Sequence, residues 1–296
     1  MFKNAIQEAL RWTSPIMTIV RYIDDTEVVP GSATLVVVNA DGWILTCKHV
    51  LQELLAGDQI SQRRSAYLGD KAALGAKPSH NALKKLRAKH GYDKEPAYEL
   101  LHQLPIADTF SGFDYHAHTE CDLALIRLKG FSQLRTTGFP TFSSAGDPPA
   151  HGEMLCRVGF PFPEFSHFHY DAATDSIGWK AGHHTPTPFF PLEGMVTRHL
   201  GGPSGSVFGF EMSTPGLRGQ SGGPVVDQQG VVHGVQSATA HHDLNFDVKA
   251  QVRRGPKKQM VTSTPFLHVG HAVSAHVMTS FMSANGVKYN SVAPAP

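Results

Sequence analysis

Residues Thr214–Val226, with the sequence Thr-Pro-Gly-Leu-Arg-Gly-Gln-Ser-Gly-Gly-Pro-Val-Val, place one serine on a glycine-rich turn. Gly219 stands two positions before Ser221, and two more glycines follow the serine directly. Glycine permits positive φ angles and the close approach of another backbone. A nucleophilic serine needs such surroundings, because a substrate carbonyl must reach its hydroxyl while backbone N–H groups point at the developing oxyanion. The proline and valines that follow predict a strand.

Two known arrangements contain a Gly-x-Ser-x-Gly motif. One is the nucleophile elbow of α/β-hydrolases, in which a strand turns directly into a helix. The other is the Gly-x-Ser-Gly-Gly-Pro loop of trypsin-like serine proteases. Two glycines and a proline at 222–224 are a poor helix interior, whereas 225–232 has two β-branched runs around a polar turn and predicts a hairpin. The trypsin-like order of catalytic residues is histidine, acid, serine, so this arrangement predicts both partners upstream of Ser221.

Both partners are found upstream. Gly42–Val50 has the sequence Gly-Trp-Ile-Leu-Thr-Cys-Lys-His-Val, an apolar strand that ends at His49. It resembles the strand-then-histidine segment of trypsin-like proteases, which is Thr-Ala-Ala-His in vertebrate enzymes and Thr-Asn-x-His in the bacterial HtrA group. Cys121–Leu128 resembles the family's Asp-Ile-Ala-Leu-Leu-x-Leu, with Asp122 opening an apolar strand. Over residues 14–285 the chain thus resembles the trypsin-like serine proteases, and most closely the HtrA-like group without a PDZ domain.

This resemblance implies a mostly β fold of two six-stranded antiparallel β-barrels, with an N-terminal helix, a helical insertion and a C-terminal helix. We expect residues 1–135 to form the N-terminal barrel and residues 150–285 to form the C-terminal barrel. The helical insertion is expected at about 62–118, and residues 286–296 are expected to be a flexible tail. The insertion could cover the cleft, bind a partner or be a neutral surface elaboration.

The sequence also predicts the secondary structure of four further stretches. Asn81–His90 and Glu95–Leu104 have helical composition and are the expected helices of the insertion. Gly270–Met282 is expected to be the C-terminal helix of the family. Residues 163–192 are rich in aromatic residues, histidine and proline, and predict a long loop.

The resemblance also implies roles for the three motif residues. Ser221 would attack the scissile carbonyl, His49 would accept and return its proton, and Asp122 would orient the imidazole and stabilise its charged form. The backbone N–H groups of Gly219 and Ser221 would form the oxyanion hole. The implied activity is a serine endopeptidase, a hydrolase that works through an acyl-enzyme.

Substrate-binding residues are expected on both sides of the cleft. Gly234–Thr239 resembles the family strand that pairs with the substrate backbone, and the floor of the primary pocket should come from just before the serine loop. The candidate residues are Ser213, Thr214, Pro215, Ser237, Ala238 and Thr239. Since no acid stands at the expected floor, a preference for small or apolar substrate side chains is predicted.

The chain departs from the vertebrate pattern in two places. Position 220 is Gln220, where those enzymes carry aspartate, and there is no Ile-Val-Gly-Gly start to form the activating ion pair. Zymogen cleavage by that route is therefore not expected. An activating protein partner or self-association is the predicted alternative, as in HtrA-type enzymes.

Composition limits the other classes of partner. The chain of 296 residues has 26 basic and 25 acidic residues, a net charge of +1, so nothing in it demands nucleic acid or an anionic membrane. The 18 histidines lack zinc-site spacing, so neither a metal nor another cofactor is predicted. The basic run Lys249–Lys258 predicts a solvated hairpin.

Targeting signals and cysteines suggest the compartment. No apolar run approaches the roughly 18 residues that a membrane span needs, and residues 1–12 lack a signal-peptide core and predict a short amphipathic helix. Cys47, Cys121 and Cys156 are an odd, sparse set that argues against a disulfide-stapled secreted protein. They are expected to be buried small hydrophobes, although a redox role for the two beside catalytic positions stays open. The predicted location is the cytoplasm.

Three functions remain as alternatives. The first is an active serine endopeptidase acting on a polypeptide substrate with the triad His49, Asp122 and Ser221. The second is a catalytically latent or non-catalytic trypsin-like module with a binding or regulatory function. The third is an esterase or another hydrolase that uses the same triad.

Overall fold

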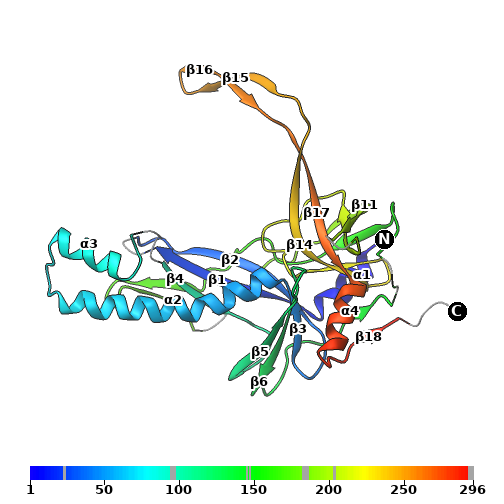
Figure 1. Ribbon diagram of the computed structural model, residues 1–296, viewed down its shortest axis with the longest axis horizontal. Coiled ribbons are helices and arrows are strands. Elements are labelled where there is room, and N and C mark those ends of the chain that lie inside the picture. The colour runs from blue at the N-terminus through cyan, green and yellow to red at the C-terminus, as the bar shows by residue number, and fades with distance from the viewer. Residues whose placement is uncertain are drawn as a thin grey trace.

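The computed structural model describes residues 1–22, 25–93, 98–144, 146, 148–181, 187–202 and 205–292. Within these residues the fold is mostly β, with two large, mainly antiparallel sheets and four helices. Figure 1 shows the two sheets meeting in a central body from which two long arms project. No helix in the described part of the chain is both long and apolar enough to cross a membrane.

The first sheet has six strands in the order β4-β1-β2-β3-β6-β5, all antiparallel to their neighbours. The strands are β1 (Thr13–Tyr22), β2 (Val29–Val37), β3 (Trp43–Thr46), β4 (Tyr98–Gln103), β5 (Gly112–Ala117) and β6 (Ala124–Lys129). The hairpin between β2 and β3 turns at Gly42, whose φ of +78° suits the predicted Asp-Gly turn. β3 is buried along its whole length.

The second sheet closes into a ring, because β13 pairs with both β8 and β14. Six strands form the ring: β8 (Met154–Arg157), β11 (Leu192–Gly201), β12 (Val207–Met212), β13 (Pro224–Val226), β14 (Val231–Asp243) and β17 (Phe266–Ser274). Two short strands, β7 (Thr141–Phe142) and β18 (Asn290–Ser291), extend this sheet beside β14. The expected two-barrel architecture is therefore confirmed.

One apolar core joins the two sheets. It contains side chains from both sheets and from two short helices, α1 (Lys3–Leu10) and α4 (Ala275–Ala284). Ala5 and Ala9 are the buried residues of α1, and Met278 and Met282 lie fully buried on α4. The N-terminal and C-terminal helices predicted from the sequence thus close the core from outside the sheets.

The first arm is helical. α2 (Lys48–Ala73) leaves the end of β3 and runs beside β4, and α3 (His80–Lys89) packs back against α2 (Figure 1). α2 passes close to β4 at Gly57, where a Cβ atom would lie 2.8 Å from the His102 ring. Glycine thus allows the helix to approach the strand despite its low helix propensity.

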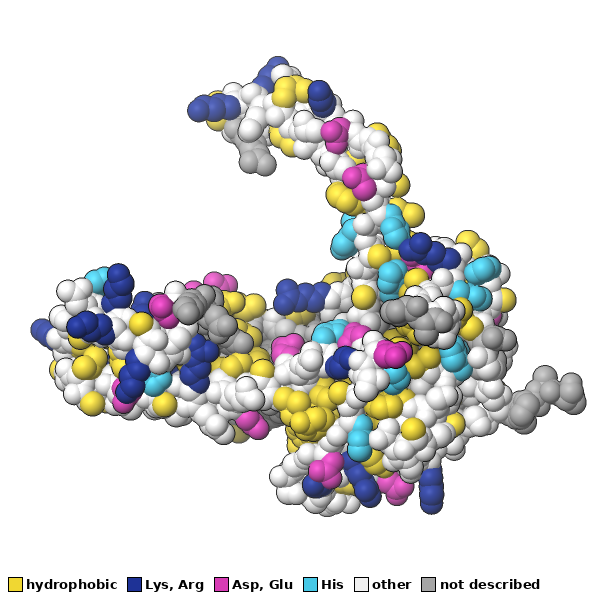
Figure 2. Space-filling view, viewed as in Figure 1, with side chains coloured by type: hydrophobic (Ala, Val, Ile, Leu, Met, Phe, Trp, Pro, Cys, Tyr) yellow, Lys and Arg dark blue, Asp and Glu magenta, His cyan; other side chains and the backbone are white. Residues whose placement is uncertain are grey.

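The second arm is a two-stranded ribbon that continues β14 and β17 away from the body (Figure 1). Its tip is formed by β15 (Val248–Arg254) and β16 (Lys257–Ser263), so the basic run is a hairpin as predicted. The ribbon contributes no residue to the buried clusters of the described chain. Figure 2 shows Lys and Arg side chains gathered on the helical arm and at the ribbon tip.

Several boundaries differ from the sequence predictions. The helical arm begins at Lys48 rather than near residue 62, and the interpretation of Glu95–Leu104 as a helix is wrong, because Tyr98–Gln103 is strand β4. β4 pairs with Met17–Tyr22 of β1 and buries Leu100, so sheet pairing overrides the helical composition. Residues 112–117 are likewise strand β5, not insertion.

The C-terminal half also contains corrections. Gly270–Ser274 is strand, because it pairs with both β12 and β14, and the C-terminal helix begins only at Ala275. Part of the expected flexible tail is ordered, since Asn290–Ser291 pairs with β7. The expected long loop at 163–192 contains a hairpin, β9 (Phe168–Asp171) and β10 (Ser176–Trp179), while 182–186 lies outside the described residues. The division into domains at about 135–150 stays a prediction.

Candidate active site

Three neighbouring strand ends position the motif residues. His49 lies in the first turn of α2, three residues beyond the end of β3, and Asp122 lies in the loop before β6. β3 and β6 are paired, with Thr46 opposite Ala124. His49, which follows Thr46, and Asp122, which precedes Ala124, are therefore brought together. Ser221 lies in the turn before β13 of the second sheet.

Asp122 accepts three hydrogen bonds. His49 Nδ1 lies 2.8 Å from Asp122 Oδ2, and the backbone N–H of His49 donates to Oδ1 at 3.0 Å. The hydroxyl of Ser237 donates to Oδ2 at 2.8 Å. Burial alone would raise the pKa of Asp122, but these hydrogen bonds outweigh it and lower the pKa to about 2. The carboxylate is therefore ionised at any pH near neutrality.

The same hydrogen bond changes the pKa of His49. Its hydrogen bond to Asp122 raises its pKa above the ordinary value of 6.5, while partial burial opposes that shift. A neutral imidazole donating Nδ1–H to Asp122 keeps Nε2 as an acceptor. With 48% of its side chain exposed, His49 presents this nitrogen to the cleft.

A clamp from β2 holds the serine loop. The backbone N–H of Thr34 donates to the carbonyl of Ser221 at 2.9 Å, and the Thr34 hydroxyl donates to the carbonyl of Gly219 at 2.7 Å. The same hydroxyl accepts from the backbone N–H of Phe160 at 3.2 Å. The first sheet thus fixes the loop that the second sheet carries. Sequence reasoning missed Thr34, since a threonine within a strand has no local signature.

The glycines around Ser221 are required by the backbone. Gly219 has a φ of +99°, and a Cβ atom there would lie 2.6 Å from the carbonyl oxygen of Phe160. Gly222 has a φ of +84°, and its Cβ would collide with the carbonyl of Thr34. Both positions combine a left-handed backbone with a close neighbour, which only glycine tolerates without strain.

Gln220 supports the loop from inside. It is fully buried, its Oε1 accepts the backbone N–H of Leu217 at 3.0 Å, and its Nε2 donates to the carbonyl of Phe190 at 3.0 Å. A neutral side chain therefore occupies the position of the family's aspartate and makes its own hydrogen bonds. The backbone N–H groups of Gly219 and Ser221 donate to no acceptor among the described residues.

Ser221 lies at the junction of the two sheets, because its backbone carbonyl accepts from Thr34 of β2 and β13 follows it. The glycines after it pair with Gln236, whose backbone carbonyl accepts from Gly222 at 2.9 Å and whose N–H donates to Gly223 at 2.8 Å. The next residue is Ser237, which contacts Asp122. In the described part of the chain no hydrogen bond joins Ser221 Oγ to the His49 ring. Such contacts are often loose in enzymes without bound substrate.

The six expected substrate-binding residues are not equivalent. The Ser213 hydroxyl accepts from the backbone of Met195 at 3.0 Å, and the Thr214 hydroxyl donates to the carbonyl of Glu193 at 3.0 Å, so both side chains bind β11. Ser237 supports Asp122 rather than the cleft wall. Thr239 donates to the carbonyl of Gly216 at 2.6 Å and so links the two expected walls. Ala238 is exposed, and the carbonyl of Pro215 is bound by Arg157.

Cys47 lies behind the His49–Asp122 pair. Its thiol is fully buried 3.1 Å from the carbonyl of Gln236, and burial, followed by the charge of Asp122, raises its pKa well above the ordinary value. Atoms of Cys47, His49 and Asp122 lie within 4.8 Å of one another, the one such trio in the described chain that could hold a metal. A thiol held protonated and a 2.8 Å His–Asp hydrogen bond suit proton transfer better than metal ligation. All three cysteines are free and buried.

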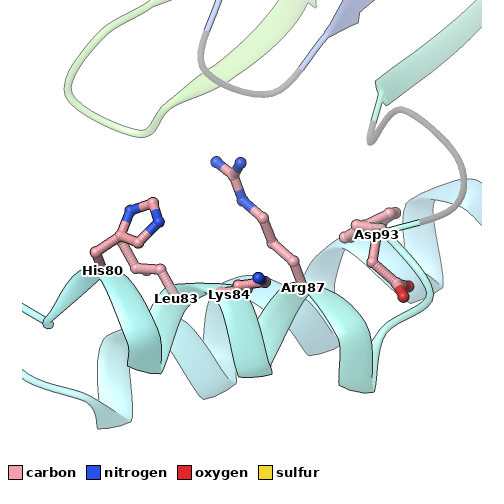
Figure 3. A pocket seen from close by; sticks show the side chains of 6 residues that line it. His80, Leu83, Lys84, Arg87 and Asp93 are labelled. Carbon is pink, nitrogen blue, oxygen red and sulfur yellow. The ribbon is translucent and has the colours of Figure 1, made fainter.

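A hollow elsewhere lacks this chemistry. It lies on the helical arm and is lined by His80, Leu83, Lys84, Arg87, Tyr92 and Asp93 (Figure 3). Figure 3 shows the Arg87 side chain pointing away from α3, with His80 at one end of the lining residues and Asp93 at the other. Of the described residues, no serine, threonine or cysteine lines this hollow. We therefore place the candidate active site at His49, Asp122 and Ser221.

The two barrels, with a histidine–aspartate pair on one and a serine in a glycine-rich turn on the other, fit the chymotrypsin-like fold. The comparisons agree: the model of the trypsin-like peptidase domain family matches residues 31–235, more than half of the chain, and the chain belongs to that family. The match includes all three motif residues. A search among curated proteins found no match.

Proposed function

We propose that this protein is a serine endopeptidase that cleaves polypeptides with the triad His49, Asp122 and Ser221, and that it belongs to the HtrA-like group. The observation that carries the proposal is the set of three hydrogen bonds on Asp122, which keeps that carboxylate ionised and aims His49. A scaffold with no catalytic duty would need neither this arrangement nor a serine loop in which two glycines hold left-handed conformations.

The proposed reaction follows from these groups. Ser221 Oγ attacks the scissile carbonyl while His49 Nε2 accepts its proton, and Asp122 stabilises the imidazolium. The N–H groups of Gly219 and Ser221 stabilise the oxyanion, a contribution of roughly 3 kcal/mol per donor. His49 then protonates the leaving amine, and water hydrolyses the acyl-enzyme by the same route in reverse order.

The polypeptide substrate, an activating partner or self-association, and the location are also proposals. The two projecting arms are surfaces on which a partner or a second copy could act, and α2 carries His49 in its first turn. The free, buried cysteines accord with a reducing cytoplasm.

Labelling of the serine tests the proposal. A fluorophosphonate probe should add one adduct to the wild-type protein and none to Ser221→Ala, read by intact mass. Ser283→Ala, which removes an exposed hydroxyl that contacts Tyr289, is the matched control and should label like the wild type. Hydrolysis of an unfolded protein and of simple esters then separates a peptidase from an esterase.

The second candidate is a latent or regulatory module. It is favoured by the missing hydrogen bond between Ser221 Oγ and the His49 ring in the described structure. Under this alternative neither wild type nor Ser221→Ala would label, and adding an activating partner would restore labelling to the wild type alone if the module is latent.

A further inference from the structure

Arg157 is a fully buried cation at the last position of β8. Its Nη1 donates to the carbonyl of Pro215 at 2.5 Å, and its Nη2 donates to the carbonyl of Thr214 at 3.1 Å. Nη2 also lies 3.3 Å from the sulfur of Met212. The guanidinium therefore reaches the segment just before the serine loop, which the sequence marks as the floor of the primary specificity pocket.

This cation has no counterion in the described part of the chain. Within the described residues its partners are the carbonyls of Thr214 and Pro215 and the thioether of Met212, and its Nε has no hydrogen-bond partner. The buried carboxylate Glu211, on β12 of the same sheet, is bound by Arg198 and by His242. Burial lowers the pKa of Arg157 to about 10, so it remains charged at neutral pH.

A structural role alone does not explain the charge. Two backbone carbonyls can be satisfied by a neutral donor, whereas a buried cation without a counterion carries a large desolvation cost. A buried guanidinium of this kind is tolerated where a bound anion can neutralise its charge.

The place of Arg157 fits the substrate cleft. Its guanidinium lies against Gly270 of β17, where a Cβ atom would lie 2.8 Å from the guanidinium carbon and 2.9 Å from the carbonyl of Thr214. Gly270 is paired with Thr239 of β14, the strand expected to bind the substrate backbone. Glycine therefore leaves room for the cation between the expected floor and the expected wall.

A second polar group lies at the same wall. Gln236 is buried, its Nε2 donates to the carbonyl of Ala238 at 2.7 Å, and its Oε1 has no partner. A Cβ atom on Gly216 would lie 2.6 Å from the amide carbon of Gln236, so this amide fills the space beside the segment that Arg157 binds. The amide nitrogen carries two hydrogens and the carbonyl of Ala238 uses one, so the other remains as a second N–H donor at this wall.

We propose that Arg157 determines the primary specificity, and that it takes a carboxylate side chain, glutamate or aspartate, at the residue immediately before the scissile bond. The carboxylate accepts hydrogen bonds from the second N–H of Arg157 Nη1 and from the second N–H of Gln236 Nε2, and supplies the missing counterion. The inference rests on the proposed peptidase function and replaces the expectation of small or apolar side chains. That expectation considered only the residues next to Ser221 in sequence, and Arg157 comes from a distant strand.

The first test uses the wild-type protein. Fluorogenic tetrapeptides that differ only in the residue before the scissile bond (Glu, Asp, Gln or Leu) are compared by kcat/KM. We expect Glu to exceed its isostere Gln by about 30-fold or more, the range of a charge-assisted hydrogen bond that is made or lost. Equal or faster cleavage after Gln or Leu would overturn the proposal.

The second test uses Arg157→Gln, which keeps amide donors but removes the charge. The Glu-to-Gln ratio should fall to within about threefold of unity, as expected when the charge-assisted bond is gone. Arg135→Gln is the matched control, because it removes the same charge from an exposed ion pair with Asp108 and should leave the ratio unchanged. A ratio that persists in Arg157→Gln contradicts the proposal.

A third measurement separates this inference from the proposed function. Peptides that end in Glu or Gln are bound to Ser221→Ala and their affinities are measured by fluorescence anisotropy. Tighter binding of the Glu peptide without turnover by the wild type would support an acid-selective pocket and contradict the peptidase proposal. Equal affinities would refute the role of Arg157 even if the wild type cleaves peptides.

Discussion

Replacing Gln220 by leucine tests whether a neutral side chain orders the serine loop. The wild-type amide makes two buried hydrogen bonds, to the N–H of Leu217 and to the carbonyl of Phe190, and leucine makes neither. Each backbone group left without a partner costs about 1–3 kcal/mol, and burial of the leucine side chain offsets about 1–2 kcal/mol of the total. The expected net loss is about 3 kcal/mol.

The loss falls on the loop that carries Gly219 and Ser221, so activity should respond as well as stability. A change of about 3 kcal/mol alters the ratio of ordered to disordered loop roughly a hundredfold, and we expect labelling of Ser221 by a fluorophosphonate to slow by at least tenfold. Urea unfolding gives the stability change, and labelling kinetics at 25 °C and pH 7.5 give the second readout. Gln229→Leu, in an exposed turn, is the matched control and should change stability by less than about 0.5 kcal/mol. If Gln220→Leu is labelled at the wild-type rate and its free energy of unfolding falls by less than about 0.5 kcal/mol, the amide does not hold the loop.

Three further changes follow from the same contacts. Asp122→Asn should lower kcat by about four orders of magnitude with an unchanged circular dichroism spectrum, because the amide cannot hold His49 in its donor tautomer; a loss below tenfold would contradict that role. Since His49 has a raised pKa and must be neutral to act as a base, kcat/KM should rise with pH through a midpoint above 6.5. Ser237→Ala removes one hydrogen bond from Asp122, so the carboxylate should stabilise the imidazolium more strongly and move this midpoint upward. A downward move would refute the role of Ser237 as a donor to Asp122. Replacing residues 244–265 of the ribbon by an Asn-Gly turn, which joins the paired residues Asp243 and Phe266, should shift Tm by no more than about 3 °C, because the ribbon lies outside the buried clusters; a larger drop would show that it stabilises the body.

The sequence predicted the parts of the site that are local. Ser221, His49 and Asp122 each stand next to a strand in a motif whose glycines or apolar run follow from the required geometry, and the structure confirms the two-barrel fold in which they occur. The sequence predicts the start of the helical arm near residue 62, whereas α2 begins at Lys48. α2 continues directly from the histidine motif and contains Gly57, which lowers the helix propensity of that stretch.

The parts that were missed are contacts between distant strands. Thr34 clamps the serine loop from β2, and Arg157 reaches the expected pocket floor from β8. In sequence each resembles an ordinary strand residue, and β8 is too short for its periodicity to show that Arg157 is buried. Such residues become visible only when register and topology are known.

Gln220 and Arg157 together hold the segment that leads into the serine loop. Gln220 binds the backbone on the serine side, at Leu217, and Arg157 binds it further upstream, at Thr214 and Pro215. The segment between them is therefore held at both ends by side chains from within the second barrel. An acidic substrate residue would also neutralise the charge on one of these two anchors. Binding of the preferred substrate should then order the loop further, which predicts that Ser221→Ala gains thermal stability with a peptide ending in Glu, and gains less with its Gln counterpart.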